Sequence, residues 1–172
     1  MALKTLQDLF VGELQDVYSA EKQILKALPK MAMTASSPDL RRAFEAHHKQ
    51  TEDQVARLEM IFEQLGASPR RKKCKGMEGL LAEGTEIMED EGEQAVIDAG
   101  LIAAAQRVEH YEMAAYGCLH TYAMLLGQPN AATLLEQSLG EEEATNQLLS
   151  NLADGGVNEA AFSAGANSGE EE

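Results

Sequence analysis

The stretch Leu101-Ile-Ala-Ala-Ala-Gln-Arg-Val-Glu-His-Tyr-Glu112 places glutamates on a helix face where apolar residues are expected. Steps of three or four residues along it give the series Ile102, Ala105, Glu109, Glu112, Tyr116, Leu119, Ala123 and Leu126. Such spacing is typical of the face that an amphipathic helix packs against a core. Because burying an unpaired carboxylate costs several kcal/mol, acidic residues in this seam require a cation or shared protons.

Three other segments carry the same interruption of an apolar seam. The first reads Phe10, Leu14, Val17, Glu21, Ile24, Leu28 and Met31. The second reads Leu40, Phe44, His47, Thr51, Gln54, Leu58, Ile61 and Leu65. The third reads Ala131, Leu135, Ser138, Glu142, Thr145, Leu149 and Leu152. Each segment is therefore predicted to be a helix with polar side chains directed into the core.

The order of these segments predicts an all-α protein, a ferritin-like antiparallel four-helix bundle. Helices are expected over residues 5–33, 39–65, 92–126 and 129–153, and the short turns between members of each pair favour two hairpins. Residues 67–91 have the length of a crossover between the second and third helices, with a short extra helix near 77–90. The bundle is thus predicted over residues 1–153, and the small, acidic segment 154–172 is predicted to be a disordered tail.

The spacing of the polar residues predicts a shared level in the core. Glu109 and Glu142 are 33 residues apart, and the same step from Glu21 leads to Gln54. Carboxylates with some imidazole are the ligands that divalent iron and manganese prefer in bundle cores. We therefore expect one or two iron or manganese ions at a site drawn from Glu21, His47, Gln54, Glu109, Glu112 and Glu142.

Plainer interpretations of the same residues stand beside the metal site. The polar layer is alternatively a hydrogen-bonded core in which Arg57 and Arg107 each neutralise one glutamate. The pair Glu45-x-x-His48 has the spacing of a di-iron motif, but Glu45 falls on a predicted solvent face. Cys118, which lies among small apolar residues, is predicted to be a buried thiol.

Composition limits the classes of protein to consider. The net charge of −15 argues against general nucleic-acid binding and favours solubility. Arg70, Arg71, Lys72, Lys73 and Lys75 form the one basic island, expected to be a solvated loop or to pair with the acidic half of the chain. No apolar run reaches the roughly 18 residues of a membrane span, and no secretory signal is evident. A cytoplasmic protein with reduced cysteines is expected.

Three segments carry a resemblance to a known family. Asp16-Val-Tyr-Ser-Ala-Glu-Lys-Gln23, residues 101–112 and Leu139-Gly-Glu-Glu-Glu-Ala-Thr145 resemble the YciE/YciF family of ferritin-like bacterial stress proteins, related to rubrerythrin. The resemblance covers about residues 1–153. It implies a ferritin-like bundle, a cytoplasmic location, a homodimer and a link to stress response.

The resemblance also implies a comparison with the rubrerythrin pattern of metal ligands. Four residues match it by position: Glu21, Glu109, Glu112 and Glu142. Three positions depart from it: Gln54 replaces a glutamate, and Arg57 and Thr145 replace histidines. Two functions follow as hypotheses: a metal-dependent oxidoreductase that reacts with oxygen or peroxide, and a non-catalytic helical scaffold that has lost a complete di-metal site.

Overall fold

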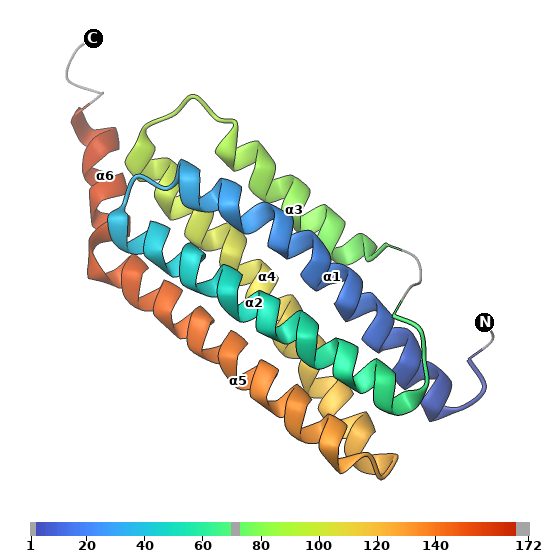
Figure 1. Cartoon of the computed structure of the whole chain (residues 1–172). Coiled ribbons are helices and arrows are strands. Elements are labelled where there is room, and N and C mark those ends of the chain that lie inside the picture. The colour runs from blue at the N-terminus through green and yellow to red at the C-terminus, as the bar shows by residue number, and fades with distance from the viewer. Residues whose placement is uncertain (1–2, 70–72, 168–172) are drawn as a thin grey trace.

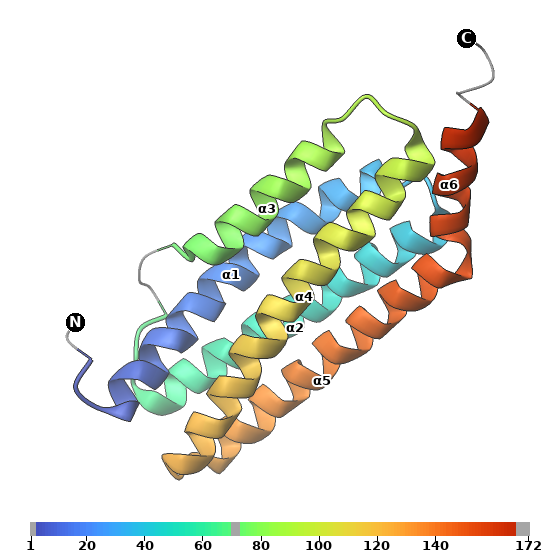
Figure 2. The ribbon, with the colours of Figure 1, turned by 180° about the vertical axis from the view of Figure 1, so that it is seen from behind.

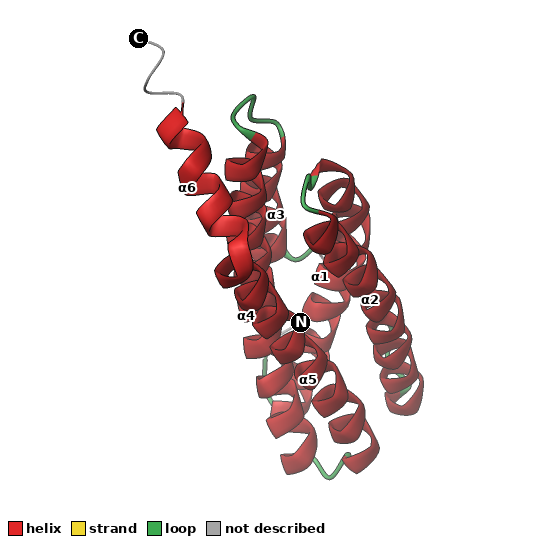
Figure 3. Ribbon diagram, turned by 90° about the vertical axis from the view of Figure 1, so that its left-hand side faces the viewer, coloured by secondary structure: helices red, strands yellow, loops and turns green. Residues whose placement is uncertain are grey.

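The computed structural model describes residues 3–69 and 73–167, and all regular elements within them are helices (Figure 3). Four long helices form the bundle: α1 (Leu6–Thr34), α2 (Pro38–Leu65), α4 (Gln94–Leu125) and α5 (Pro129–Leu152). α1 pairs with α2, and α4 pairs with α5, in two antiparallel hairpins (Figure 1). The predicted ferritin-like fold is therefore confirmed.

The crossover between the hairpins contains α3 (Lys75–Met88). This helix packs along α1 and α4 and returns the chain to the end of the bundle at which α2 begins (Figure 2). Of the basic island, residues 70–72 lie outside the described part of the chain. Lys73 is exposed and pairs with Glu78 at 2.6 Å.

The ends of the helices follow from local sequence signals. Thr5 and Asp8 form a capping box, in which the Thr5 hydroxyl accepts from the Asp8 amide at 3.0 Å. Pro38 and Pro129 begin α2 and α5, where the missing amide hydrogen costs nothing. Gly66 ends α2 at φ 59°, a left-handed conformation that glycine adopts without a steric penalty.

The core consists of two apolar clusters with the polar layer between them. The upper cluster contains Ile24, Leu28, Met31, Leu40, Phe44, Leu101, Ile102, Ala105, Val108 and Leu149, among others. The lower cluster contains Phe10, Leu14, Val17, Leu58, Ile61, Tyr116, Leu119 and Leu135, among others. Along every long helix the polar seam residues fall between these two groups, so the polar layer is sealed from both ends of the bundle.

The chain after residue 153 differs from the predicted disordered tail. A π-helical turn, η1 (Ala153–Val157), leads into α6 (Asn158–Asn167), which packs against α4. Gly156 adopts φ 133°, which redirects the chain, and Val157 packs on the upper cluster. This local anchoring holds a segment whose composition alone favours disorder. Residues 168–172 lie outside the described part of the chain.

Candidate metal centre

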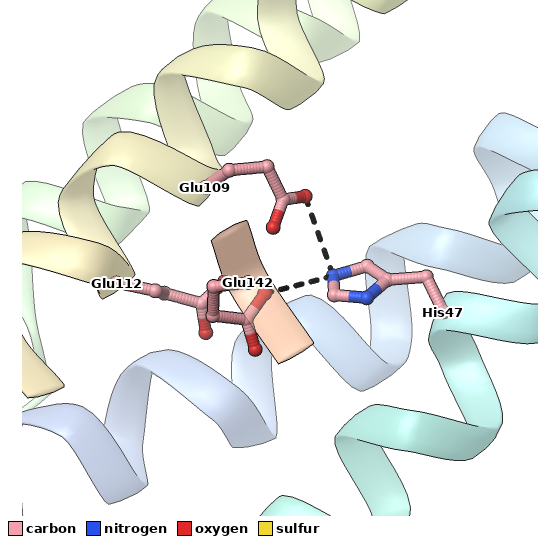
Figure 4. Close-up of side chains that lie close together, drawn as sticks. All are labelled: His47, Glu109, Glu112 and Glu142. Atoms are coloured by element: carbon pink, nitrogen blue, oxygen red, sulfur yellow. Dashed lines mark ion pairs between the residues drawn. The ribbon is translucent and has the colours of Figure 1, made fainter. Parts of the chain in front are cut away.

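Three helices direct ligand atoms to one point in the polar layer. His47 comes from α2, Glu109 and Glu112 from α4, and Glu142 from α5 (Figure 4). One oxygen or nitrogen from each residue lies within 4.8 Å of those of the others. Glu109 and Glu112 are three residues apart, so they project from the same face of α4. All four side chains are buried.

The imidazole of His47 faces two of the carboxylates. Its Nε2 lies 3.4 Å from Glu109 Oε1 and 3.8 Å from Glu142 Oε2. Its sequence distance from Gln54 left open whether it reaches this level of the core. The structure brings it there because Glu142 lies between the two α2 residues: Oε1 accepts from Gln54 Nε2, while Oε2 faces His47.

Glu21 and Gln54 complete the predicted layer, but they lie outside the four-residue group. Tyr116 donates its hydroxyl hydrogen to Glu21 Oε1, and Gln54 uses its amide to bind Glu142. Glu21 is also close enough to Glu112 to interact with it electrostatically. The structure thus brings together all six residues that the sequence singled out, with Glu21 and Gln54 beside the central four.

Burial and mutual repulsion change the protonation of these carboxyl groups. Desolvation raises the pKa of Glu21 to about 8, and the negative charge of Glu142 adds to this rise. Desolvation likewise raises the pKa of Glu109 and of Glu112 well above the ordinary value, with further contributions from neighbouring glutamates. The site therefore favours bound protons or a bound cation over free negative charge.

Neither arginine neutralises these glutamates through a salt bridge. Arg57 is buried but directs its guanidinium away from the layer, where it binds both oxygens of Glu141 at 2.7 and 2.8 Å and Ser138 Oγ at 2.8 Å. Its charge lowers the pKa of Glu21 only as the smallest of the contributing causes. Arg107 lies at the surface, 3.6 Å from Glu83.

The layer contains an unusual concentration of unsatisfied polar atoms. Within the described part of the chain, buried atoms without a hydrogen-bond partner include Glu21 Oε2, His47 Nδ1, His47 Nε2, Gln54 Oε1, Glu109 Oε2, Glu112 Oε1, Glu112 Oε2 and Glu142 Oε2. Buried polar groups are normally satisfied, and these are nearly all potential metal ligands. The donor set therefore fits a divalent iron or manganese ion.

The alternative motif on α2 lies elsewhere. Glu45 is exposed and His48 is half-buried, as the heptad positions predict, and neither belongs to the group of ligand atoms. Thr145, at the position where a histidine would extend the site, is buried and donates to the Glu141 carbonyl at 3.0 Å. The helix α5 therefore supplies one ligand residue, Glu142.

Sequence reasoning missed a second buried polar chain. Tyr111 donates to Asp16 Oδ2 at 2.6 Å, and Cys74 Sγ lies 3.0 Å from the same tyrosine oxygen. Cys74 also caps α3, since Met77 N donates to its sulfur at 3.5 Å. Asp16 is adjacent to the quoted seam in sequence, but no periodic signal connects it to Cys74 in the crossover.

The two cysteines contrast in burial. Cys74 is buried, whereas Cys118 is exposed. The prediction of a buried Cys118 is therefore wrong. α4 is rich in small apolar residues around its whole circumference, so composition near Cys118 did not identify the face on which it lies.

The fold and the buried carboxylate layer define this protein as a ferritin-like helical bundle. The family described as domain of unknown function DUF892 matches residues 5–162. Protein YciF of Escherichia coli (strain K12) is 46% identical over 162 residues, 94% of this chain and 98% of that protein. The chain belongs to this family, as its resemblance to the YciE/YciF proteins predicts.

Solved structures support the same assignment. The crystal structure of the E. coli stress protein YciF superposes with a TM-score of 0.88, at 46% identity, over 91% of this chain and 99% of that one. YcfI from Rhodopseudomonas palustris, provisionally described as a structural protein, gives a TM-score of 0.83 at 39% identity, over 86% and 94% of the two chains. None of the described helices is both long and apolar enough to cross a membrane.

Proposed function

We propose that this protein binds a divalent transition-metal ion, iron or manganese, through His47, Glu109, Glu112 and Glu142. The observation that carries the proposal is their convergence, with one ligand atom from each within 4.8 Å of the others and no arginine or lysine paired with them among the described residues. A cation would satisfy several of the orphaned oxygens and offset the raised pKa values of Glu109 and Glu112.

The geometry favours one ion as the main occupant. Gln54 offers an amide in place of a carboxylate, and Glu21 already accepts from Tyr116, which leaves fewer ligands for a second ion. When bound, iron or manganese would supply redox chemistry with oxygen or peroxide. The protein contributes the ligands, holds them at a fixed separation and excludes bulk water with the two apolar clusters.

We extend the description of the E. coli relative as a stress protein to this chain as part of the proposal. A cytoplasmic location and a homodimer belong to it as well. Mass measurement in solution tests the homodimer, and a mass of one chain would contradict it.

Metal analysis tests the proposal directly. The wild-type protein and a Glu109→Ala/Glu142→Ala variant are purified without chelator, and iron and manganese are measured per chain. We expect about one ion per wild-type chain and loss of most of it in the variant, since two of the four ligand residues are removed. Equal metal in both proteins would refute the proposal.

The second candidate function is a non-catalytic helical scaffold. It is favoured by the departures at Gln54, Arg57 and Thr145 from the rubrerythrin pattern and by the description of the R. palustris relative. In a scaffold, Glu109→Gln leaves stability unchanged or raises it, because it relieves repulsion among carboxylates that no metal offsets. Added ferrous iron or manganese then leaves the melting temperature unchanged, whereas a metal site raises it.

A further inference from the structure

Two small cavities lie side by side between the polar layer and α3. The inner cavity is bounded by His47 and Glu109 of the candidate site. The outer cavity lies beneath α3 and is bounded by Gly84 and Ala104. The two cavities share four lining residues, which are Ala27, Met31, Leu81 and Val108. A seam between α1, α3 and α4 therefore leads from the cover formed by α3 to two of the proposed ligands.

The walls of this seam select against polar molecules. Apart from His47 and Glu109, every residue that lines either cavity is apolar or glycine. Each cavity has a volume of about 10 Å³, enough for one small molecule. An ion or hydrogen peroxide would lose hydrogen bonds to water on entering such a cavity, whereas dioxygen has almost none to lose.

We propose that this seam admits dioxygen to the His47 and Glu109 side of the metal centre, and that α3 covers the entrance. The inference rests on the proposed function and narrows it, because it selects dioxygen over peroxide as the small oxidant. α3 is the element that encloses the outer cavity, through Leu81 and Gly84, as its position along α1 and α4 shows (Figure 2).

Dissolved oxygen provides a test that needs no metal, because it is paramagnetic and speeds the relaxation of nearby protons. Methyl relaxation is compared under nitrogen and under oxygen pressure in the metal-free protein. We expect a severalfold larger oxygen effect at Val108 and Ala105 than at Val17 and Ala123, which are equally buried in the lower cluster. An equal effect at both pairs would overturn the proposal.

Substitutions that fill the seam sharpen the test. Ala27→Leu adds volume at a residue that lines both cavities, and it should reduce the oxygen effect at Val108 to that of Val17. Gly84→Ala fills only the outer cavity and should reduce the effect at Ala104. Its added Cβ would lie 3.6 Å from Ala104 Cβ, an ordinary contact, so this variant keeps the fold if Ala27→Leu does not.

Gly79→Ala is the matched control on the same helix, since its added methyl group would meet nothing within 4 Å. It should leave the relaxation of every seam methyl group unchanged. An unchanged effect in Gly84→Ala, or an equal reduction in Gly79→Ala, would contradict the seam. Metal content, measured separately, distinguishes the two proposals: protein that binds metal but shows no oxygen effect refutes only the seam, and the reverse result refutes only the metal centre.

Discussion

His47 is the one basic side chain in the group of candidate ligands, and both of its ring nitrogens lack a hydrogen-bond partner in the described structure. A buried imidazole usually binds a partner through at least one nitrogen. Its Nε2 faces two carboxylates at 3.4 and 3.8 Å, beyond the length of a normal hydrogen bond. This spacing is consistent with ligands arranged around a shared ion.

His47→Ala should weaken manganese binding at least about tenfold, since substitutions of residues that merely support a metal ligand already cost that much. Isothermal titration calorimetry of the metal-free protein measures the affinity. The neighbouring residue provides the control, because His48 is half-buried and lies outside the group of ligand atoms. His48→Ala should bind manganese like the wild type, and an equal loss in both variants would exclude a specific role for His47.

At the scale of elements, α3 is held to the bundle by polar contacts as well as by packing. Tyr111 of α4 links Asp16 of α1 to Cys74, the residue that caps α3. The ring of Tyr111 also packs closely on Gly76, where an added Cβ would lie 2.8 Å from Cε2. One tyrosine therefore joins three elements that are remote in the sequence.

Tyr111→Phe should lower the free energy of unfolding by about 1–3 kcal/mol, because it removes the hydroxyl that donates to Asp16 and leaves that carboxylate without its partner. Urea denaturation measures the change. Tyr122→Phe is the control, since Tyr122 packs on the lower cluster and no hydrogen bond to its hydroxyl is seen in the described structure. A loss in Tyr122→Phe as large as that in Tyr111→Phe would show that the hydroxyl contacts contribute nothing specific.

The turn between α1 and α2 is fixed by a carboxylate from α4. Asp98 is buried and accepts from Ser36 N at 2.8 Å, Ser36 Oγ at 2.7 Å and Ser37 N at 2.8 Å. Ser37 in turn caps α2. Asp98 therefore connects one hairpin to the start of the other.

Asp98→Ala should destabilise the protein by roughly 3 kcal/mol, since it leaves two backbone amides and a hydroxyl without their charged acceptor. Thermal or urea denaturation provides the measurement. Asp53→Ala, which removes an exposed carboxylate from the middle of α2, should change stability by less than about 0.5 kcal/mol. Similar losses in the two variants would contradict the role assigned to Asp98.

At the scale of the whole molecule, the buried acidic layer reverses the usual effect of acid on a folded protein. The pKa of Glu21 is about 8 in the folded state and near 4.5 when unfolded, so the folded state binds the proton more tightly. The stabilisation this provides is fully present below pH 4.5 and is lost as the pH rises to about 8. Glu109 and Glu112 shift in the same direction.

The melting temperature of the metal-free protein should therefore rise when the pH falls from 8 to 5, by about 2–4 °C for each kcal/mol gained. Scanning calorimetry checks this. Glu21→Gln should flatten part of the trend, which separates the layer from the general decrease in negative charge. Added manganese should stabilise more at pH 8 than at pH 5, because its ligands must lose their protons. A melting temperature that falls on acidification would contradict this reading.

Much of the fold and of the candidate site follows from local patterns. The seams predicted all four long helices, and Thr5, Pro38, Gly66 and Pro129 marked their ends within a few residues. The 33-residue repeat correctly placed Gln54 beside Glu142. These features are readable because helix periodicity and capping depend on residues a few positions apart.

Only the tertiary structure decided which partner each polar side chain has. His47 reaches the carboxylates, Arg57 binds Glu141 and not the buried layer, Cys118 lies on the exposed face of α4, and residues 158–167 form a helix. Each outcome depends on which helices are neighbours and on how far a long side chain extends across the gap between them. By itself the sequence determined that carboxylates enter the core; their grouping around one point, without a paired arginine among the described residues, is a property of the packed bundle.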